Sequence, residues 1–378
     1  MVLFRRLFLK DLKMMFQVNV TLTVLIILSL ESTFSQTPPK GFEGLKGTLY
    51  THTITDRSDS LSSKEINEFR DENGISLWFS RDFHKTVCLT GVCKMIRIRI
   101  YWTGIETYLG LQPHGKDSLT KYDHKKFTKE DYLKLDQILS DSLSILKRSK
   151  LEDLIVKVEK KDNDQVDAIS GATPPSVSEF VVKDAVYTCY TLWHTVYGPT
   201  LEKIWSILDQ RTNKEYLRLV FDKNVPHYSC WAIHFIERHQ QYHAVFYREI
   251  MNLIKSGNDI VSQKALHYFK VAILSETVIQ KELAVLIEEV PARKKFEIIM
   301  NFQPLAHVSN ETILIMLEQF EDQKISAAML SYVCKLIHLE NMEDFRIEKK
   351  IKNISRDKNL YVRNMTQILL SNYKNKAL

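Results

Sequence analysis

The residues of this chain that are best suited to hold a ligand lie in one short stretch, residues 166–176, with the sequence Val-Asp-Ala-Ile-Ser-Gly-Ala-Thr-Pro-Pro-Ser. Ser170 and Thr173 place two hydroxyl groups close together along the chain. Gly171 lies between them and lets the backbone approach a bound group, because glycine has no side chain and tolerates a positive φ. Hydroxyl and free backbone N–H groups are hydrogen-bond donors for a phosphate, so the stretch predicts a phosphate-binding loop.

The same stretch carries two signals for the start of a helix. Pro174 suits the first helical position after a cap at Thr173, and Ser176 with Glu179 fits a capping box slightly later. The N-terminal end of a helix favours an anion, so we expect the loop to open a long amphipathic helix that reaches residues 197–199. The alternative is an ordinary loop and helix cap without a ligand. The expected apolar stripe of this helix consists of Val177, Val181, Ala185, Thr188 and Leu192.

Residues 167–173, Asp-Ala-Ile-Ser-Gly-Ala-Thr, resemble the motif of the FMN-binding domain found in exported subunits of bacterial sodium-pumping quinone reductases and related electron-transfer complexes. In that family a threonine at the place of Thr173 carries FMN as a phosphodiester, which a flavin transferase attaches. The resemblance therefore implies that Thr173 is the attachment residue and that Asp167 is recognised by the transferase. The loop that approaches FMN closely would consist of Ser170, Gly171 and Ala172.

The resemblance covers about residues 90–199 and departs from the family at one position. Family members usually have Thr or Ser two places after the attachment threonine, whereas this chain has Pro175 there and Ser176 one place later. This departure bears on covalent attachment more than on the fold. The resemblance implies an electron carrier rather than a stand-alone enzyme, with FMN as cofactor and with a flavin transferase and a membrane or envelope redox protein as partners.

The N-terminus, residues 1–35, is typical of a secretory signal peptide. It has a basic start, an apolar core over residues 20–30, and small residues at Thr33 and Ser35 before the expected cleavage. The core is about eleven residues long and falls short of the roughly 20 that a membrane-spanning helix needs. We therefore expect an exported protein on the periplasmic or outer-envelope side of a bacterium; an uncleaved N-terminal anchor is the alternative.

The composition predicts a globular protein of two domains. The chain has 378 residues, of which 44% are hydrophobic and 26% are charged. Its net charge of +6 is too small and too dispersed to indicate nucleic-acid binding. Ten of the eleven glycines lie at or before Gly198, so the first part is rich in turns and the second is not. We expect a linker at residues 36–45, an FMN-binding-like domain at 46–199 and a helical domain at 200–378.

The first domain is expected to be α+β, with helices laid on a mostly antiparallel sheet. Its clearest strand is residues 95–102, where apolar residues alternate with Arg97 and Arg99 at the spacing of a half-buried strand. The other expected strands are residues 49–54, 75–79, 108–111 and 154–158. A helix should follow a cap formed by Thr128 and Asp131. Its expected apolar stripe is Tyr132, Leu135, Leu139, Leu143 and Leu146.

Two cysteines, Cys88 and Cys93, enclose four residues just before the clearest strand. In an oxidising compartment this spacing favours a disulfide bond. His84 adds a third possible metal ligand, although a structural zinc site needs four. The remaining cysteines are expected to be small buried hydrophobic residues; they are Cys189, Cys230 and Cys334.

Beyond residue 200 the pattern predicts only helices. They are expected to begin near residue 201 and to continue at residues 234–254, 261–275, 276–290, 292–302, 310–319, 324–339, 344–352 and 360–370. The last, after Asp357, resembles the second half of a HEAT-type repeat. Paired helices indicate a short solenoid with a surface for a protein partner, and an irregular bundle is the alternative. His239 and His243 lack the glutamate of a zinc-protease motif, since Gln240 stands in its place, so we expect packing histidines.

Two functions follow from these patterns. The first is an electron-transfer flavoprotein whose isoalloxazine takes up and passes on electrons. FMN would be attached covalently at Thr173 or bound noncovalently. The second is an interaction or scaffold protein that holds no flavin and uses the helical domain to bind another exported protein.

Overall fold

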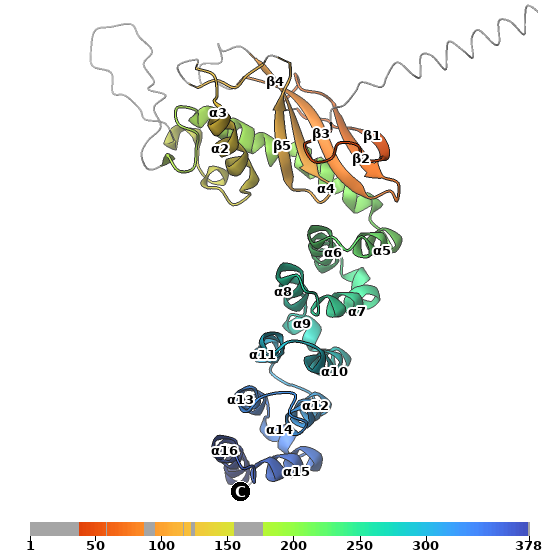
Figure 1. Cartoon of the computed structure of the whole chain (residues 1–378), viewed down its shortest axis with the longest axis vertical. Coiled ribbons are helices and arrows are strands. Elements are labelled where there is room, and N and C mark those ends of the chain that lie inside the picture. The colour runs from red at the N-terminus through yellow and green to blue at the C-terminus, as the bar shows by residue number, and fades with distance from the viewer. Residues whose placement is uncertain are drawn as a thin grey trace, which may run out of the picture. The chain divides into compact units, whose positions relative to one another are not determined.

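The computed structural model of the chain describes residues 38–57, 59–86, 95–115, 117–121, 125–154 and 177–376. The chain divides into two compact units, one that ends at Trp205 and one that begins at Ser206. The first contains a five-stranded antiparallel sheet with helices, and the described residues of the second form helices and connecting turns (Figure 1). The predicted fold class, an α+β domain followed by an all-α domain, is therefore confirmed. The finer domain limits given above stay predictions.

The sheet is a meander in which each strand pairs with the next along the chain. Four strands, β1, β3, β4 and β5, lie at or near the expected residues 49–54, 75–79, 95–102 and 108–111. The fifth strand, β2, is not predicted from the sequence. Its apolar residues Ile66 and Phe69 are three positions apart and so face opposite sides of the sheet, which gives no alternating pattern. The strands are β1 (Gly47–Thr53), β2 (Glu65–Asp71), β3 (Ser76–Lys85), β4 (Ile96–Thr103) and β5 (Tyr108–Pro113).

One face of the sheet is bonded to the helices of the first unit. The fully buried Trp102 lies on this face and donates from its indole Nε1 to the carbonyl of Val196, at the end of α3 (Val186–Val196), over 3.1 Å. Tyr108 donates to Asp136 in α2 (Lys129–Ser140) over 2.6 Å. These bonds fix the helices against β4 and β5. The apolar core on this face includes Phe79, Phe83, Ile98 and Ile100.

The helix α2 begins as the sequence predicts but ends earlier. Thr128 and Asp131 form the capping box, with Thr128 N donating to the Asp131 carboxylate over 2.9 Å and Asp131 N donating to the Thr128 hydroxyl over 3.3 Å. The helix ends at Ser140, so the predicted stripe is wrong beyond that point. Leu143 is 84% exposed, and Leu146 is buried from a separate 3₁₀ turn, η1 (Ile145–Lys147).

The long helix predicted from residues 173 or 176 to 197 is also wrong in its first part. Residues 178–185 form turns and bends, and α3 begins only at Val186. Asp184 has a φ of 60°, which ends any helical path before it. The predicted stripe is nevertheless buried, since turns can bury alternate apolar residues as well as a helix can. The predicted strand 154–158 has only Leu154 among the described residues, where it follows the 3₁₀ turn η2 (Leu151–Asp153).

The second unit is a stack of helix pairs. The second helices of the pairs begin at residues 226, 259, 292, 327 and 360, a spacing of 33 to 35 residues. The first helices are α5 (Lys214–Asp222), α7 (His243–Leu253), α10 (Thr277–Leu286), α12 (Asn310–Glu321) and α15 (Phe345–Ile354). The second helices are α6 (Pro226–Arg238), α8 (Asp259–Tyr268), α11 (Ala292–Asn301), α13 (Ala327–Lys335) and α16 (Leu360–Lys376). The unit also includes the end of α4 (Pro199–Arg211) and the short helices α9 (Val271–Leu274) and α14 (Leu339–Met342).

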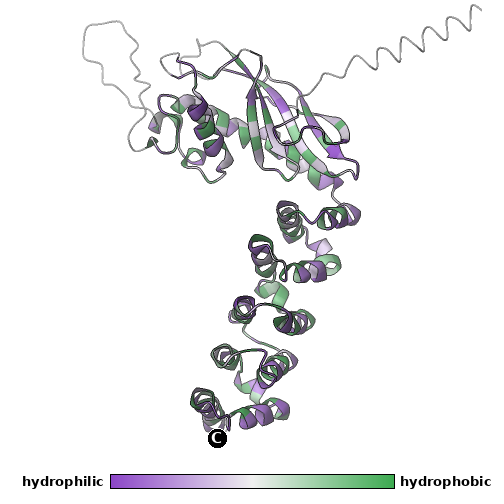
Figure 2. Ribbon diagram, in the orientation of Figure 1, coloured by the Kyte–Doolittle hydropathy of each residue, from purple (hydrophilic) through white to green (hydrophobic). Residues whose placement is uncertain are grey.

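Each pair is joined to its neighbours through apolar faces and through buried amide side chains. Figure 2 shows hydrophobic and hydrophilic residues on different sides of these helices, as expected when each pair packs on the next. Gln319 in α12 donates to the carbonyl of Ala284 in α10 over 2.8 Å, and Asn341 donates to the carbonyl of Val308 over 3.0 Å. Both amides are almost fully buried, so they specify how adjacent pairs meet.

The single helix predicted over residues 234–254 is wrong. α6 ends at Arg238, a 3₁₀ turn η4 (Gln240–Tyr242) follows, and α7 begins at His243. His239 leaves the helical region with φ −117° and ψ 75°, because the chain must turn here to begin the next pair. In the part of the chain that the structure describes, no helix combines the length and the apolar character needed to cross a membrane.

Candidate functional site

The cofactor and disulfide residues predicted from the sequence lie outside the described residues. They are Asp167, Ser170, Gly171, Ala172 and Thr173 of the motif, and Cys88 and Cys93. The predicted signal peptide, residues 1–35, lies outside them as well. The chain after the motif resumes at the buried Val177, and the carbonyl of Ser178 accepts a bond of 2.8 Å from Lys134 in α2. The downstream end of the motif is therefore tied to the helices that cover the sheet.

The other face of the sheet bears a cluster that two β-bulges create. The pairing register shifts once between β2 and β3, where Leu77 is skipped, and once between β4 and β5, where Leu109 is skipped. A bulge turns an additional side chain toward one face of the sheet. Leu77 forms a buried cluster with Trp78 and Tyr101, and Leu109 packs against it.

Aromatic rings make up most of this cluster. Phe69 stacks on Trp78 with ring centroids 5.4 Å apart, and Tyr101 meets Trp78 edge-on at 5.9 Å. Phe42, from the predicted linker, also packs here. The linker therefore contributes a side chain to the first unit and does more than connect.

Two buried polar atoms beside the cluster are unsatisfied. Trp78 Nε1 and Ser80 Oγ are buried, and neither has a hydrogen-bond partner among the described residues. Gly110, opposite Tyr101 on β5, leaves open space, because a Cβ at this position would meet no atom within 4 Å. A buried polar group without a hydrogen bond costs about 1–3 kcal/mol of stability, so Trp78 Nε1 and Ser80 Oγ both reduce the stability of this face.

A row of polar side chains crosses the same face. The Asp82 carboxylate accepts bonds from Arg99 Nε at 2.6 Å, Arg99 Nη2 at 2.7 Å and His114 Nε2 at 2.9 Å. Burial alone would raise the pKa of Asp82, but the bonds from Arg99 and His114 outweigh it and lower the pKa. The bond to Asp82 raises the pKa of Arg99, and burial raises the pKa of Tyr101, whose hydroxyl donates to Gln112 over 3.1 Å.

These shifts determine what the face can do. Asp82 remains ionised at neutral pH, and Arg99 and Tyr101 remain protonated, so none of the three is suited to exchange a proton near pH 7. The alternation in residues 95–102 already indicates the polar row of this face, since it places Arg97 and Arg99 opposite the isoleucines.

A buried carboxylate, Glu68, lies on the helix-covered face. It is fully buried and accepts bonds from His52 at 2.8 Å, from Arg70 at 2.6 Å and from the Ser76 hydroxyl. Several donors around one buried charge compensate for its lost hydration. We assign Glu68 a structural role, which the sequence pattern does not reveal.

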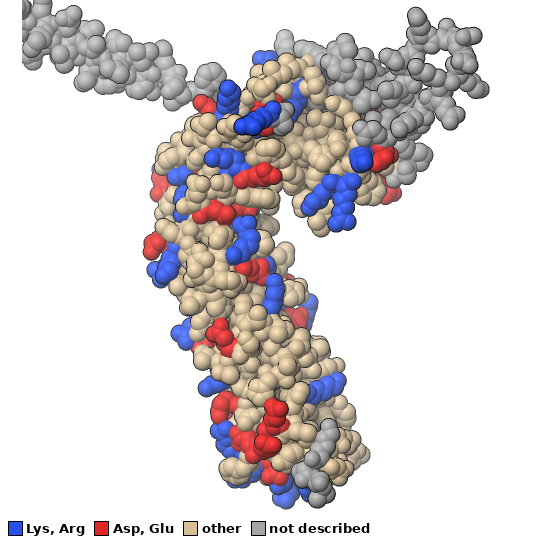
Figure 3. All heavy atoms as spheres, turned by 180° about the vertical axis from the view of Figure 1, so that it is seen from behind, with Lys and Arg blue, Asp and Glu red and all other residues tan. Residues whose placement is uncertain are grey.

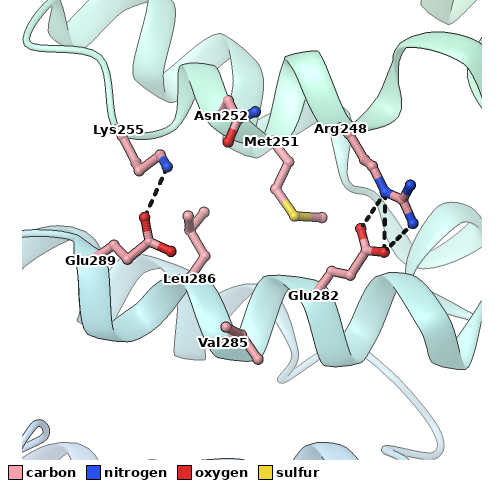
Figure 4. A pocket seen from close by; sticks show the side chains of 8 residues that line it. All are labelled: Arg248, Met251, Asn252, Lys255, Glu282, Val285, Leu286 and Glu289. Carbon is pink, nitrogen blue, oxygen red and sulfur yellow. Dashed lines mark hydrogen bonds and ion pairs between the residues drawn. The ribbon is translucent and has the colours of Figure 1, made fainter.

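The second unit has a groove between consecutive first helices α7 and α10. Its volume is about 190 Å³, and Figure 4 shows an ion pair at each end with apolar side chains between. The pairs are Arg248–Glu282 at 2.7 Å and Lys255–Glu289 at 2.9 Å. Cofactor sites usually exceed roughly 300 Å³, so this groove suits a single side chain. Its apolar lining consists of Met251, Val285 and Leu286.

The same arrangement recurs between α12 and α15 in a groove of about 510 Å³. Arg346 pairs with Glu311 at 2.8 Å, and Lys350 pairs with Glu321 at 2.7 Å. The apolar lining here includes Leu314, Ile315 and Phe345. Because the charges are paired across each groove, they contribute mainly to holding consecutive first helices together.

The two histidines of the incomplete zinc-protease pattern, His239 and His243, pack against aromatic rings, as expected. The His239 ring stacks on Phe235 at 4.0 Å, and His243 Nδ1 lies 2.7 Å from the Tyr268 hydroxyl. Over the described ranges, no group of three or more His, Cys, Asp and Glu side chains could hold a metal ion.

The fold and the surfaces of the described residues define the class of protein: an α+β unit followed by stacked helix pairs. No protein-family model, curated protein or solved structure matches the chain. Its function must therefore be argued from its own residues.

Proposed function

We propose that this chain is an exported electron carrier that holds FMN at Thr173. The observation that carries the proposal is the sequence Asp-Ala-Ile-Ser-Gly-Ala-Thr at residues 167–173. It supplies hydroxyls and a glycine where FMN phosphate would bind, and Asp167 as the residue recognised by a flavin transferase. The α+β fold of the first unit agrees with the fold expected for such a domain.

The protein would position the flavin, and the isoalloxazine would accept and release electrons. A phosphodiester at Thr173 would form when its hydroxyl oxygen attacks the flavin-bearing phosphorus of a flavin pyrophosphate held by the transferase. The P–O bond of the pyrophosphate would break, the other phosphate would leave with its substituent, and the hydroxyl proton would pass to a base of the transferase. The electrons would come from and go to a membrane or envelope redox protein. The chain would then act as a carrier and need no catalytic residues of its own.

The test is to express the chain with a flavin transferase and to measure its intact mass and its fluorescence on a denaturing gel. We expect the wild type to gain one FMN and to fluoresce, and Thr173→Ala to do neither. A flavin-family substrate domain in the same cells is the control for transferase activity. If that domain is loaded with FMN and the wild type is not, covalent attachment is excluded. A yellow colour that is lost on denaturation would indicate FMN bound noncovalently.

Pro175→Thr provides a matched variant, because it restores the residue type usual in the family. If only this variant is loaded, Pro175 is the residue that prevents attachment in the natural chain. If neither chain is loaded or coloured, the flavin proposal is wrong.

The second candidate is an interaction protein without flavin, and the regular spacing of the helix pairs in the second unit favours it. Stacked pairs of the HEAT type present extended surfaces to protein partners. A correctly folded, colourless wild-type protein would support this function.

A further inference from the structure

The second helices of the stack differ in charge from the first helices. The first helices α5, α7, α10, α12 and α15 contain eight Lys and Arg residues and eight Asp and Glu residues. The second helices α6, α8, α11, α13 and α16 contain nine Lys and Arg residues and three Asp and Glu residues. The second-helix layer therefore carries a net charge of +6 and the first-helix layer carries none.

The arrangement of the helices keeps these charges together. α6 packs on α8, α11 packs on α13, and α13 packs on α16. Asn301, the last residue of α11, donates to the carbonyls of Leu266 and Phe269 at the end of α8. The second helices thus form one continuous layer. Figure 3 shows that in the lower part of the stack the acidic side chains gather on the left of that view, the side of the first helices.

An exposed aromatic group lies in the middle of this layer, between α11 and α13. Phe296 meets Tyr332 edge-on with centroids 5.1 Å apart, and Lys335 Nζ lies over the Tyr332 ring at 4.6 Å. Met300, one turn after Phe296 on the same side of α11, is 37% exposed, as is Phe296. We call Phe296, Met300, Tyr332 and Lys335 the α11–α13 patch.

Within the described ranges, Lys335 and its neighbour in the layer, Lys295, form no ion pair. Among the described residues no carboxylate lies within 4.0 Å of the amino group of Lys335, and Lys295 donates only to the carbonyl of Lys324, over 2.7 Å. An ammonium group has three donors, so both lysines retain donors for a ligand. In the two grooves on the first-helix side, by contrast, the lining cations other than Lys349 and the carboxylates form ion pairs.

We propose that the α11–α13 patch binds an acidic protein segment that carries a large apolar side chain. Aromatic residues and Met are enriched at protein interfaces, and exposed aromatic rings with an adjacent cation suit a carboxylate next to an apolar anchor. A second copy of this chain fits less well, because a two-fold contact through this layer would bring like charges together. The inference rests on the second candidate function, binding of a protein by the helical unit, and does not depend on flavin.

The test uses the full exported chain and a fluorescein-labelled twelve-residue probe, (Asp-Glu-Phe)₄, in a fluorescence anisotropy titration at about 50 mM salt, where charge attraction is weakly screened. The comparison probe is (Lys-Arg-Phe)₄. We expect the acidic probe to bind and the basic probe not to bind. We also expect Lys335→Glu to weaken binding of the acidic probe by about tenfold or more, and Phe296→Ala to weaken it by several-fold.

The matched control is Lys349→Glu on α15, an exposed lysine in the first-helix layer that takes part in no ion pair of the described chain. It makes the same change in net charge and should alter binding less than about twofold, because Lys349 lies on a first helix, in the α12–α15 groove, and not in the α11–α13 patch. Thermal melts of all variants check folding. Equal loss in Lys335→Glu and Lys349→Glu, no binding of the acidic probe at about 1 mM, or equal binding of both probes would each overturn the proposal.

Further arms separate this inference from the functions proposed above. Thr173→Ala should bind the acidic probe as the wild type does, whatever the fate of the flavin. A photo-crosslinker at Phe296 should react with a bound partner, and one at the exposed Phe345 in the first-helix layer should not. Crosslinking at Phe345 and not at Phe296 would mean that the helical unit binds a partner through its first helices, and would overturn the assignment to the α11–α13 patch. Binding to phosphatidylglycerol vesicles but not to the acidic probe would replace the protein partner by a membrane surface and overturn the proposal.

Discussion

At the scale of single residues, a few buried polar side chains hold the first unit together. Arg81 is 1% exposed and donates to the carbonyl of Ser63, to the Asp56 carboxylate and to the Thr200 hydroxyl. These bonds join the segment before β2, the strand β3 and the start of α4. One guanidinium therefore connects three parts of the unit that are distant in sequence.

We predict that Arg81→Met destabilises the protein strongly, by about 3 kcal/mol or more, because it leaves the buried Asp56 carboxylate without its cation. Urea unfolding monitored by circular dichroism measures this. The double variant Arg81→Met/Asp56→Asn should recover part of the loss, since it also removes the buried negative charge that Arg81 faces in the wild type. A loss below about 1 kcal/mol in the single variant would contradict the role given to Arg81.

The cysteines differ in their expected reactivity. Burial raises the pKa of Cys189 and that of Cys334 to about 12, whereas Cys230 is partly exposed. Because the thiolate is the reactive form, we predict that iodoacetamide at pH 8 modifies Cys230 first, and the other two only after unfolding. Peptide mapping by mass spectrometry measures this. Early labelling of Cys189 or Cys334 would show that its helix opens more readily than the buried position indicates.

The same mapping tests the predicted disulfide bond. Cys88 and Cys93 lie in one tryptic peptide, residues 86–94. If the bond forms, this peptide stays unalkylated before reduction and is lighter by two hydrogens than its reduced form. Two alkylated cysteines in the exported, unreduced protein would refute the prediction.

At the scale of single elements, two glycines on or next to β4 and β5 differ in whether a side chain would fit at their position. A Cβ on Gly104 would lie 1.8 Å from the carbonyl oxygen of Ser76, whereas a Cβ on Gly110 would meet nothing within 4 Å. Gly104 N also donates to the carbonyl of Leu77 over 2.8 Å. Only at Gly104 does the close approach of two backbones exclude a side chain.

We therefore predict that Gly104→Ala is severely destabilising, because the backbone of β3 or of the turn must move, while Gly110→Ala is neutral or stabilising by roughly 0.5–1 kcal/mol. Melting temperatures of the two variants measure the difference. Equal melting temperatures would mean that the strands are not in the register described here.

The N-cap of α15 makes a pH-dependent contribution to stability. Hydrogen bonds from Arg346 lower the pKa of Asp344 to about 2, below the roughly 3.9 of an unfolded chain. The folded state therefore gains stability from the ionised carboxylate above about pH 4 and loses it as the pH falls toward 2. We predict that Asp344→Asn melts lower than the wild type at pH 5 and that the difference shrinks between pH 4 and pH 2.

A control for this prediction is Asp322→Asn, at an exposed position without an ion pair in the described chain. Its difference from the wild type should not follow the same pH course. A difference for Asp344→Asn that stays constant from pH 5 to pH 2 would contradict the assignment.

The elements also show what the sequence can predict. Alternation predicts β4 most clearly, because its isoleucines and Trp102 are buried on one face of the sheet while Arg97 and Arg99 lie on the other. β2 buries a carboxylate, Glu68, whose donors include His52 on β1 and Ser76 on β3, so no local pattern reveals it. The start of α3 is misplaced because apolar spacing shows which residues are buried but not the positive φ at Asp184.

At the scale of the whole molecule, the sequence predicts the two kinds of unit but not the repeat. The helix pairs recur at similar spacing, yet the first helices begin at intervals of 29 to 35 residues, and the short helices α9 and α14 are inserted between pairs. Chemically similar residues therefore do not recur at a fixed distance. The α11–α13 patch likewise requires the fold, because Phe296 and Tyr332 are brought together from separate pairs.

The amide side chains that join adjacent helix pairs have a mechanical consequence. Gln319 and Asn341 each bind a carbonyl of the preceding pair, and in a linear stack each pair is held mainly by its neighbours. A pulling force along the stack would be shared among successive junctions and would not fall on one central core. If the two ends of the stack were pulled apart, the junctions between pairs would therefore separate one by one before the helices themselves unfolded.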